Sequence, residues 1–524
     1  MMPIDALPDD LDALRALVSC LSSERDAAIE ECRRAREQND RLHHLLRQLQ
    51  RAQFGRRSER LDHEQMQLAL EDIETTIAEQ DAQEDKKDTA ETTADAQRKK
   101  RCANRGSLPA HLPRIHVTLA PEIAACPCCH GVMHVIGEDT AERLDVIPAQ
   151  YRVIVTHRPQ YACRTCEQGV VQAPAPERLI KGGLPTEAMV ASVLVAKYAW
   201  HLPLYRQAQM LLSQGITIER ATLAFWVGYA AAELKPLYLR LRELILGSTK
   251  IAVDETVAPV LDPGRGRTKK GYFWAIARDD RPWGGNDPPA VVYNYAPGRG
   301  HTHANALLGG YRGILQCDGY AAYKNVAARG SADSSITLAF CWSHVRRGFY
   351  DLAKSKAPIA IETLNRIAVL YQIEERVRGK SAADRLAPRQ AESKPLVAGL
   401  RVWFESQIAK LPARGPTAEA IRYALNHWDG LERFLEDGHI ELDNNCVERA
   451  MRPVALSRKN SLFAGSDEGA ENWSCLASLI ETCKLNGVNP QVYFTDLLTR
   501  LVNGWPQKRI DELMPWHWVP QPTP

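Results

Sequence analysis

The hydrophobic pattern at the start of the chain repeats every seven residues. From Leu11 to Leu49, apolar positions recur on two seams at the spacing of a coiled coil. The first seam runs through Leu14, Leu21, Ala28, Ala35, Leu42 and Leu49. The pattern predicts a leucine-zipper-like dimerisation segment over residues 8–62. An amphipathic helix packed on its own domain would have a similar period.

A charged segment without hydrophobic periodicity follows. Residues 71–97 carry ten acidic and two basic side chains, and a basic run begins at Arg98. Such a composition buries too little apolar surface to order itself, so residues 71–107 are predicted to be an acidic and then basic linker. Lys99, Lys100 and Arg101 are candidate phosphate contacts, although solvated charge explains them equally well.

A helical pattern occupies residues 184–246. Within it, Arg206–Val227 has the form of a helix-turn-helix with Gly215 at the turn. The expected shared core is Leu211, Ile216, Leu223 and Val227. Arg220 and Thr222 fall on the exposed face of the second helix and are candidate DNA contacts. A plain helical hairpin is the alternative.

After Lys250 the periodicity becomes that of strands. The expected order is strands at Ile251–Val260, Tyr272–Arg278 and Ala290–Tyr295, a helix at Thr302–Leu308 and a strand at Ile314–Cys317. Three strands, a helix and a fourth strand are typical of the ribonuclease-H-like α/β fold, in which the first and fourth strands are neighbours.

Together, these elements predict a multidomain α+β protein. The catalytic domain is expected over residues 248–470, with a helical insertion at about 355–437. A helical segment over residues 471–524 completes the chain.

Three acidic residues stand out in the predicted catalytic domain. Asp254 lies within the first strand, Asp318 ends the fourth, and Glu448 lies on a later helix that Asp443 is expected to cap and Pro453 to limit. Carboxylates that converge from separate elements can hold two Mg²⁺ ions for phosphoryl transfer. For Glu448 alone, a surface ion pair with Arg452 is an equally good explanation.

Two Cys-x-x-Cys pairs, Cys126/Cys129 and Cys163/Cys166, flank a strand-like segment. Each pair can present two thiolates to one tetrahedral Zn²⁺, so together they predict a closed structural zinc site. The predicted zinc module covers residues 115–175.

The composition of the chain does not indicate a function by itself, but it limits the classes of protein to consider. The 524 residues include 66 Lys and Arg against 64 Asp and Glu, a net charge of +2, so DNA binding must rest on local patches. The sequence contains neither a secretory signal pattern nor a long apolar run. We therefore expect a cytoplasmic protein without a membrane partner, associated with the nucleoid when it is bound to DNA.

Several long motifs resemble the large transposase of IS66-type insertion sequences, a bacterial DDE transposase family. They include the segments that begin at Phe54, Leu108, Lys197, Asp443 and Arg458, together with the four-cysteine module. The resemblance implies a catalytic triad of Asp254, Asp318 and Glu448 with Mg²⁺, for which Mn²⁺ can substitute.

The resemblance also implies partners: the terminal inverted repeats of the element, target DNA and accessory proteins of the same element. Cys341 and His344 match a Cys/Asp-x-x-His signature of several DDE families, and Asn444 lies one helical turn before Glu448. Candidate contacts to non-bridging phosphate oxygens are Arg449, Arg452, Arg458 and Lys459.

The sequence hypothesis is therefore a DNA transposase that binds element ends and carries out Mg²⁺-dependent strand cleavage and strand transfer. Two alternatives remain open at this point. One is a DNA-binding regulator that no longer cuts DNA. The other is a ribonuclease-H-like nuclease that hydrolyses DNA without joining it.

Overall fold

The chain divides into two compact units, residues 1–154 and 155–524. The computed structural model describes residues 10, 12, 22, 25, 26, 114–116, 150–162, 170–262, 266–328, 336–412 and 414–520. Apart from those five single residues, the predicted zipper lies outside the described residues. The linker and all four predicted zinc ligands lie outside them as well.

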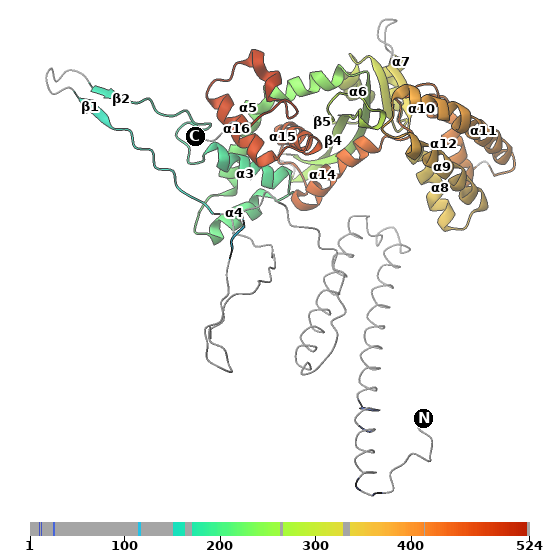
Figure 1. Cartoon of the computed structure of the whole chain (residues 1–524), viewed down its shortest axis with the longest axis horizontal. Helices are drawn as coiled ribbons and strands as arrows, with labels where there is room; N and C mark the ends of the chain where they lie inside the picture. The colour runs from blue at the N-terminus through green and yellow to red at the C-terminus, as the bar shows by residue number, and fades with distance from the viewer. Residues whose placement is uncertain are drawn as a thin grey trace, which may run out of the picture. The chain divides into compact units, whose positions relative to one another are not determined.

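A sheet of five strands forms the centre of the described second unit (Figure 1). Its strands are β3 (Lys250–Asp262), β4 (Arg267–Arg278), β5 (Ala290–Ala296), β6 (Gly313–Cys317) and β7 (Ile336–Phe340). They lie in the order β5-β4-β3-β6-β7, with antiparallel pairing from β5 to β3 and parallel pairing from β3 to β7. The predicted order of elements is confirmed, as is the pairing of the first and fourth strands.

The sequence prediction did not include β7. Its five residues are too few for a period of two to be distinguished from other patterns. β7 pairs with β6 over its whole length, and the last pair joins Cys317 to Phe340. Cys341 therefore follows β7 at the same end of the sheet where Asp318 follows β6.

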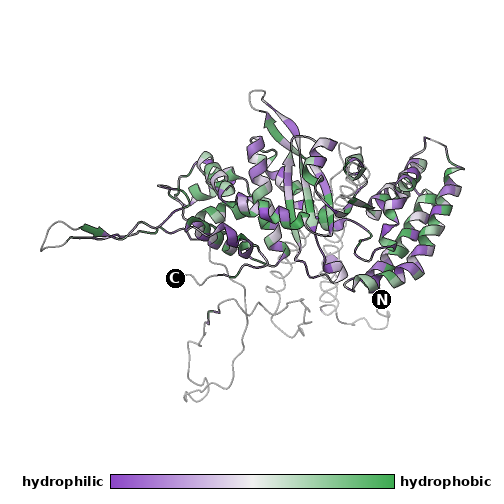
Figure 2. Ribbon diagram, turned by 90° about the horizontal axis from the view of Figure 1, so that it is seen from above, coloured by the Kyte–Doolittle hydropathy of each residue, from purple (hydrophilic) through white to green (hydrophobic). Residues whose placement is uncertain are grey.

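Helices cover both faces of the sheet. They are α6 (His301–Leu308) and α7 (Ala321–Ala328) on one face and α14 (Asn445–Ser461) and α15 (Asp467–Leu485) on the other. Because neighbouring side chains on a strand point to opposite faces, Trp274 lies 5.9 Å from Tyr323 of α7, and Phe273 lies 4.8 Å from Trp473 of α15, between ring centroids. The central parts of the strands are accordingly rich in buried apolar residues, and Figure 2 shows hydrophobic residues in green.

The helix α15 also covers the edge strand β5. The backbone N–H of Tyr293 donates to the hydroxyl of Ser478 at 2.8 Å, and that of Val291 donates to the hydroxyl of Thr482 at 3.2 Å. The predicted domain boundary at residue 470 falls inside this helix. We therefore assign α15 to the sheet domain.

Within residues 170–250, all of which the structure describes, three helices precede the sheet. They are α3 (Glu187–Tyr198), α4 (Leu204–Ser213) and α5 (Arg220–Leu246). Gly215 adopts a φ of +77° in the turn between α4 and α5, a conformation that favours glycine. Leu211, Leu223 and Val227 are buried, as the helix-turn-helix pattern predicts. The second helix runs 27 residues and leads directly to β3.

A helical insertion lies between β7 and α14 (Figure 1). It contains α8 (Trp342–Lys354), α9 (Pro358–Val377), α10 (Ala382–Pro388), α11 (Lys394–Ile408), α12 (Pro416–Asn426) and α13 (Trp428–Leu431). Its core includes the stacked rings of Phe349 and Phe404, 5.5 Å apart. The insertion is helical as predicted, and it begins with α8, before the expected residue 355.

Two predictions about α14 were wrong. Asn444, not Asp443, is its N-cap; Asp443 instead accepts a hydrogen bond from the backbone N–H of Asn445 at 3.1 Å. The helix also continues through Pro453 to Ser461. A proline removes one backbone hydrogen bond, but the packing of buried Met451 and Val454 on either side holds the helix together.

The described chain ends in α16 (Pro490–Val502) and a 3₁₀ segment, Gln507–Leu513. In α16, Phe494 and Leu497 are buried, and the helix packs against α3. Within the described ranges, no helix combines the length and the apolar character needed to cross a membrane.

Candidate active site

Asp254 lies on β3, on the sheet face that α14 covers. Its neighbours Val253 and Ala252 are buried, whereas the Asp254 carboxylate is partly accessible and accepts a hydrogen bond from the backbone N–H of Glu255 at 2.9 Å. Ala275 of β4 lies directly opposite Asp254 in the ladder. This small residue leaves space beside the carboxylate.

Asp318 follows β6 and lies next to Asp254. The parallel register pairs Ala252 with Gln316, and two further residues along each strand place Asp254 beside Asp318. The Asp318 carboxylate accepts a hydrogen bond from the backbone N–H of Tyr320 at 2.8 Å. Gly319 between them has a φ of +89°, which permits this tight turn. The two acids that the sequence selected thus come from adjacent strands, Asp254 from within β3 and Asp318 from just after the end of β6.

Glu448 approaches from the first turns of α14. The amide of Gln316 donates to the carbonyls of Glu441 at 2.7 Å and Asp443 at 3.0 Å, which anchors the segment before α14 to β6. The N–H of Trp342 donates to the carbonyl of Leu442 at 3.0 Å from the other side. These contacts fix where α14 begins and direct Glu448 toward the strand ends.

The three carboxylates lie close enough to influence one another. Burial raises the pKa of Asp254 to about 7, with the negative charge of Glu255 as the next cause and those of Asp318 and Glu448 as smaller ones. Such a concentration of negative charge favours binding of a cation. Three carboxylates from three elements form the oxygen donor set that Mg²⁺ prefers, so these residues fit a divalent metal.

The accessory residues predicted from sequence gather around Glu448. One carboxylate oxygen of Glu448 lies 3.6 Å from Nδ1 of His344, and the other lies 3.6 Å from Arg347 of α8. Cys341 is buried, and its sulfur accepts the backbone N–H of Asn444 at 3.3 Å. Burial raises the pKa of Cys341 to about 12, so it remains a thiol and acts here as a hydrogen-bonding group.

Cys341, His344 and Glu448 place one ligand-type atom each within 4.8 Å of one another. The side chain of Asn444 is 1% exposed, and within the described part of the chain its amide oxygen and nitrogen have no hydrogen-bond partner. Buried polar atoms of this kind call for a partner such as water or a bound ion. This orphaned amide therefore supports the fit of a hydrated cation at the site.

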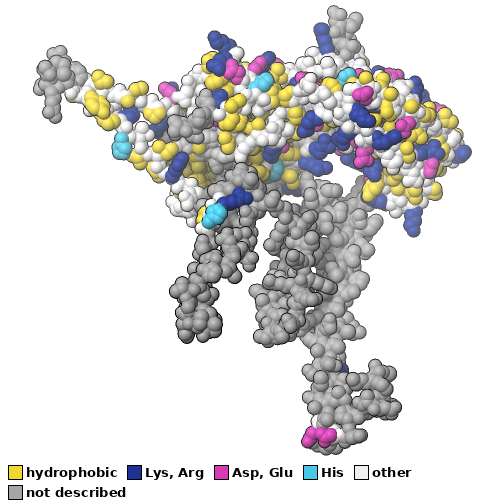
Figure 3. Space-filling model, in the orientation of Figure 1, with side chains coloured by type: hydrophobic (Ala, Val, Ile, Leu, Met, Phe, Trp, Pro, Cys, Tyr) yellow, Lys and Arg dark blue, Asp and Glu magenta, His cyan; other side chains and the backbone are white. Residues whose placement is uncertain are grey.

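The basic candidates on α14 lie on the surface. Arg449, Arg452 and Lys459 are exposed, and Figure 3 shows Lys and Arg side chains gathered where α14 lies. Arg458 is partly buried and donates to the carbonyl of Val257 on β3. On α5, Arg220 and Thr222 are exposed as predicted. Lys99, Lys100 and Arg101 lie outside the described residues.

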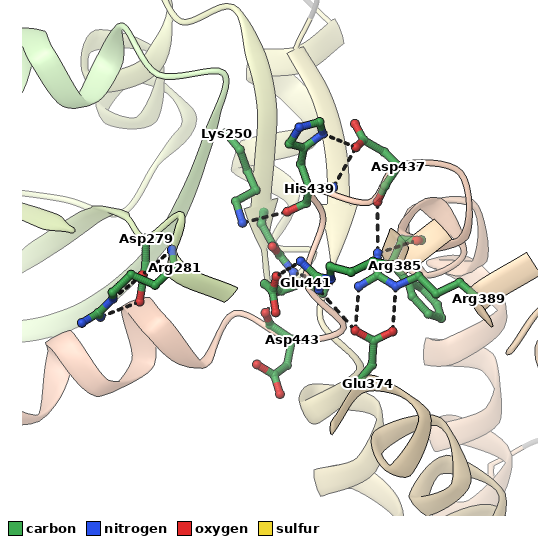
Figure 4. Close-up of polar contacts among 12 residues, drawn as sticks. Lys250, Asp279, Arg281, Glu374, Arg385, Arg389, Asp437, His439, Glu441 and Asp443 are labelled. Atoms are coloured by element: carbon green, nitrogen blue, oxygen red, sulfur yellow. Dashed lines mark hydrogen bonds and ion pairs between the residues drawn. The ribbon is translucent and has the colours of Figure 1, made fainter. Parts of the chain in front are cut away.

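A buried ionic network joins the insertion to the segment before α14 (Figure 4). Glu374 of α9 accepts hydrogen bonds from Arg389 at 2.6 and 2.7 Å and from Arg385 at 3.3 Å. Arg385 in turn lies 2.7 Å from the carboxylate of Glu441. Both guanidinium groups are almost completely buried, so removal of their shared carboxylate would leave uncompensated charge in the interior.

Glu255, the neighbour of Asp254 on β3, is not among the site residues that the sequence predicts. It faces α7, opposite to Asp254, and its side chain is only 1% exposed. Its carboxylate pairs with Arg299 at 2.5 Å and accepts a hydrogen bond from Tyr323. The Arg299 guanidinium lies 4.0 Å from the ring centroid of Tyr320, directly after Asp318 and Gly319. The apolar surroundings of Glu255 in the sequence were the available signal.

The four predicted zinc ligands have no described geometry. Residues 163–169, which contain Cys163 and Cys166, connect two short antiparallel strands, β1 (Gln160–Ala162) and β2 (Val170–Gln172). The sequence predicts a hairpin strand at residues 151–157, but these residues are not in a strand; the paired strands lie directly beside the Cys163/Cys166 pair instead.

Comparisons with known proteins cover nearly the whole chain. A family model described as "Transposase IS66 family" matches residues 182–472, and the "IS66 C-terminal element" matches residues 478–516. Residues 41–117 match "Transposase C of IS166 homeodomain" and residues 124–167 match "zinc-finger binding domain of transposase IS66". The last match covers all four predicted zinc ligands.

Full-length relatives occur in Sinorhizobium fredii. Its uncharacterized protein y4qI is 43% identical over 545 residues, which cover 99% of each chain. Its uncharacterized protein y4jD is 46% identical over 477 residues, 90% of this chain and 93% of the relative. A third, y4hP, is 35% identical over 90% of this chain and 88% of the relative.

Proposed function

The chain belongs to the IS66 transposase family, and from this premise we propose that it is a DDE transposase that cuts DNA at the ends of an insertion sequence and joins those ends to target DNA. Asp254, Asp318 and Glu448 are the proposed catalytic triad. The observation that carries this assignment is the convergence of three carboxylates from β3, β6 and α14.

The proposal includes a ribonuclease-H-like fold for the sheet domain. Its support is the element order, with three antiparallel strands followed by a helix and a parallel strand beside the first. In such a sheet the first and fourth strands bring their acids together. The helical insertion then separates the second acid from the third in sequence without separating them in space.

Two Mg²⁺ ions held by the triad would lower the pKa of the attacking water or 3′-hydroxyl and stabilise the leaving oxygen. Around the triad, the hydroxyl of Ser343 donates to the carboxylate of Glu448 at 3.3 Å, and His344 and Arg347 lie 3.6 Å from it. Burial within the sheet limits water around Asp254. Asn444 offers an amide that can orient a water molecule or a phosphate oxygen near Glu448.

We further propose DNA as the partner of several surfaces. Arg449, Arg452 and Lys459 on α14 are placed to contact backbone phosphates beside the triad, with Arg458 in a supporting role because it also binds β3. Other proposed contacts are Arg220, Thr222, Lys99, Lys100 and Arg101. Phosphate contacts of this kind supply affinity and orientation rather than sequence specificity.

The remaining parts of the proposal concern assembly. Cys126, Cys129, Cys163 and Cys166 are proposed to hold one structural Zn²⁺, in agreement with the zinc-finger family match over residues 124–167. The zipper over residues 8–62 is proposed to pair two protomers so that two DNA ends can be held together. Accessory proteins of the same element are proposed as further partners.

The test is Mg²⁺-dependent cleavage and joining of a labelled duplex that carries the terminal repeat. Asp254→Asn, Asp318→Asn and Glu448→Gln should each lower the rate by about 10³-fold or more, because several kcal/mol of transition-state stabilisation depend on the metals. DNA binding should persist. Asp351→Asn, at an exposed acid of α8, is the matched control and should cut at the wild-type rate.

Each alternative predicts a different result in this assay. If the three variants cut as fast as wild type, the site is elsewhere. Wild-type protein that binds DNA without cutting, even with the accessory proteins present, would indicate a regulator. Cutting without joining would indicate a nuclease.

A further inference from the structure

A second candidate site lies beyond the triad, at the far end of α14. It is a pocket of about 280 Å³ between α3, α5, the last turn of α14 and the first turn of α15. Its walls include apolar side chains such as Tyr198, Val227 and Trp473, and its polar groups include Lys197 and Asn472. Apolar walls with a few polar groups are the usual character of a small-ligand site. The volume suits one small planar group.

The wall of this pocket contains a glycine in the middle of a long helix. Gly228 lies inside α5, where glycine lowers helix stability relative to alanine. Packing does not require glycine here, since an added Cβ would meet only the amide nitrogen of Asn472, at 3.8 Å. Asn472 lines the same pocket. The glycine therefore preserves open space at a cost in helix stability.

Strained and exposed apolar residues stand at the rim. Leu462, the C-cap of α14, has a φ of +62°, which is costly for a residue with a Cβ, and its side chain is 64% exposed. Phe463 follows it, lines the pocket and is 40% exposed. Apolar side chains held at the surface beside a cavity are suited to insertion between stacked bases.

A basic helix face connects this rim to the triad. Arg449, Arg452 and Lys459 follow at intervals of three and seven residues along the exposed side of α14, so they lie on one face. Glu448 lies at the start of that face and Phe463 just beyond its end. A DNA strand that follows these cations away from the triad would reach the pocket.

We propose that this pocket receives an unpaired base from the DNA strand that runs along α14, while Leu462 and Phe463 fill the gap that the base leaves in the stack. This inference rests on the proposed transposase function and adds a site for strand distortion to it. Lys197 and Asn472 supply hydrogen-bond donors for the edge of the base, and the aromatic and aliphatic walls contact its faces. Burial lowers the pKa of Lys197 to about 8, so it gains from an acceptor in the pocket.

The length of α14 fixes which base is involved. Ser457 and Ser461 line the pocket and lie nine and thirteen residues after Glu448, or roughly 14–20 Å along the helix. At about 3.4 Å per nucleotide of duplex, this distance corresponds to about four to six nucleotides from the scissile phosphate.

The experiment measures binding of full-length protein, without Mg²⁺, to labelled duplexes that carry the terminal repeat and one mismatch at successive positions. A mismatch lowers the cost of unpairing, so it should tighten binding by about tenfold, but only about four to six nucleotides from the cleavage position. Gly228→Leu fills the pocket and improves helix propensity, and should abolish this gain. Gly399→Leu is the matched control. Gly399 is an exposed glycine inside α11, and a Cβ added there would meet no other atom within 4 Å.

The possible results separate this inference from the transposase proposal. A position-specific gain in wild type and Gly399→Leu that is lost in Gly228→Leu and reduced in Phe463→Ala supports the base pocket. Equal gains in wild type and Gly228→Leu, or no gain at any position, overturn the base pocket and leave the triad proposal untouched. Absence of any binding to the terminal repeat would overturn both.

Discussion

Gln316 connects two of the three acid-bearing elements through one side chain. Its amide nitrogen donates to the carbonyls of Glu441 and Asp443, and the residue is 1% exposed. Asp318 lies two residues later, just after the end of the same strand. The position of Glu448 relative to Asp318 therefore depends on a neutral hydrogen-bonding group that performs no chemistry itself.

We predict that Gln316→Met lowers the cleavage rate without abolishing DNA binding. The substitution leaves two buried carbonyls without their donor, which costs about 1–3 kcal/mol for each unsatisfied group. A displacement of about 1 Å at Glu448 would reduce the rate by up to about 100-fold. Single-turnover cleavage measures the effect.

The control is Gln390→Met. Gln390 also donates its amide to a backbone carbonyl, that of Leu435 at 2.6 Å, but it lies in the insertion on an exposed surface. It should cut at close to the wild-type rate. Equal rates for the two variants would show that Gln316 has no positioning role.

At the scale of single residues, the sequence predicted those site residues whose neighbours in the chain make them unusual. Asp254 lies in an apolar strand and Asp318 directly follows one, and an unpaired carboxylate in such a setting is costly unless it has a function. The roles of Gln316 and Glu255 depend on partners far away in the sequence. No local pattern records such partners.

At the scale of elements, α15 protects the sheet edge with side chains instead of a further strand. The hydroxyl of Thr482 accepts from the N–H of Val291 at 3.2 Å and donates to its carbonyl at 3.0 Å. The hydroxyl of Ser478 accepts from the N–H of Tyr293 and donates to the carbonyl of Ser474 within α15. An edge strand with free backbone groups invites pairing with other chains, and these two hydroxyls remove that possibility along the buried part of β5.

We predict that Thr482→Val destabilises the protein by about 1–3 kcal/mol, because two buried backbone groups of β5 lose their partner while the side-chain shape is conserved. Thr499→Val is the control. Thr499 lies on the exposed side of α16, and its hydroxyl donates within that helix to the carbonyl of Thr495 at 2.7 Å. Urea unfolding followed by circular dichroism measures both, and similar stability of the two variants would contradict the proposed role of Thr482.

The sequence predicted elements well where the periodicity was long. The strands at β3, β4 and β5 and the helices of the insertion each extend over enough residues for one period to dominate. It missed β7, which is short, and it ended α14 at Pro453 because a proline usually disrupts a helix. There, burial of Met451 and Val454 overrides a local rule, and tertiary packing of this kind is absent from the local pattern.

At the scale of the whole described unit, the helical insertion and the sheet are joined by buried charge. Glu374 on α9 binds both Arg385 and Arg389, and Arg385 extends the network to Glu441 before α14 (Figure 4). Arg389 also donates to the carbonyls of Phe434 at 2.9 Å and Asp437 at 3.1 Å. The insertion is thereby tied to the segment that positions Glu448.

We predict that Glu374→Ala destabilises the unit by about 3–5 kcal/mol, since it leaves two buried guanidinium groups without their shared carboxylate. Glu362→Ala on the same helix is the control: Glu362 pairs with Arg366 on the surface, where such a pair contributes only about 0.3–0.5 kcal/mol. Both variants change a helical glutamate to alanine, so helix propensity cancels in the comparison of urea unfolding. If the network also positions Glu448 through the segment before α14, Glu374→Ala should slow cleavage and Glu362→Ala should not. Loss of stability without loss of cleavage rate would show that the network stabilises the insertion alone and leaves Glu448 in place.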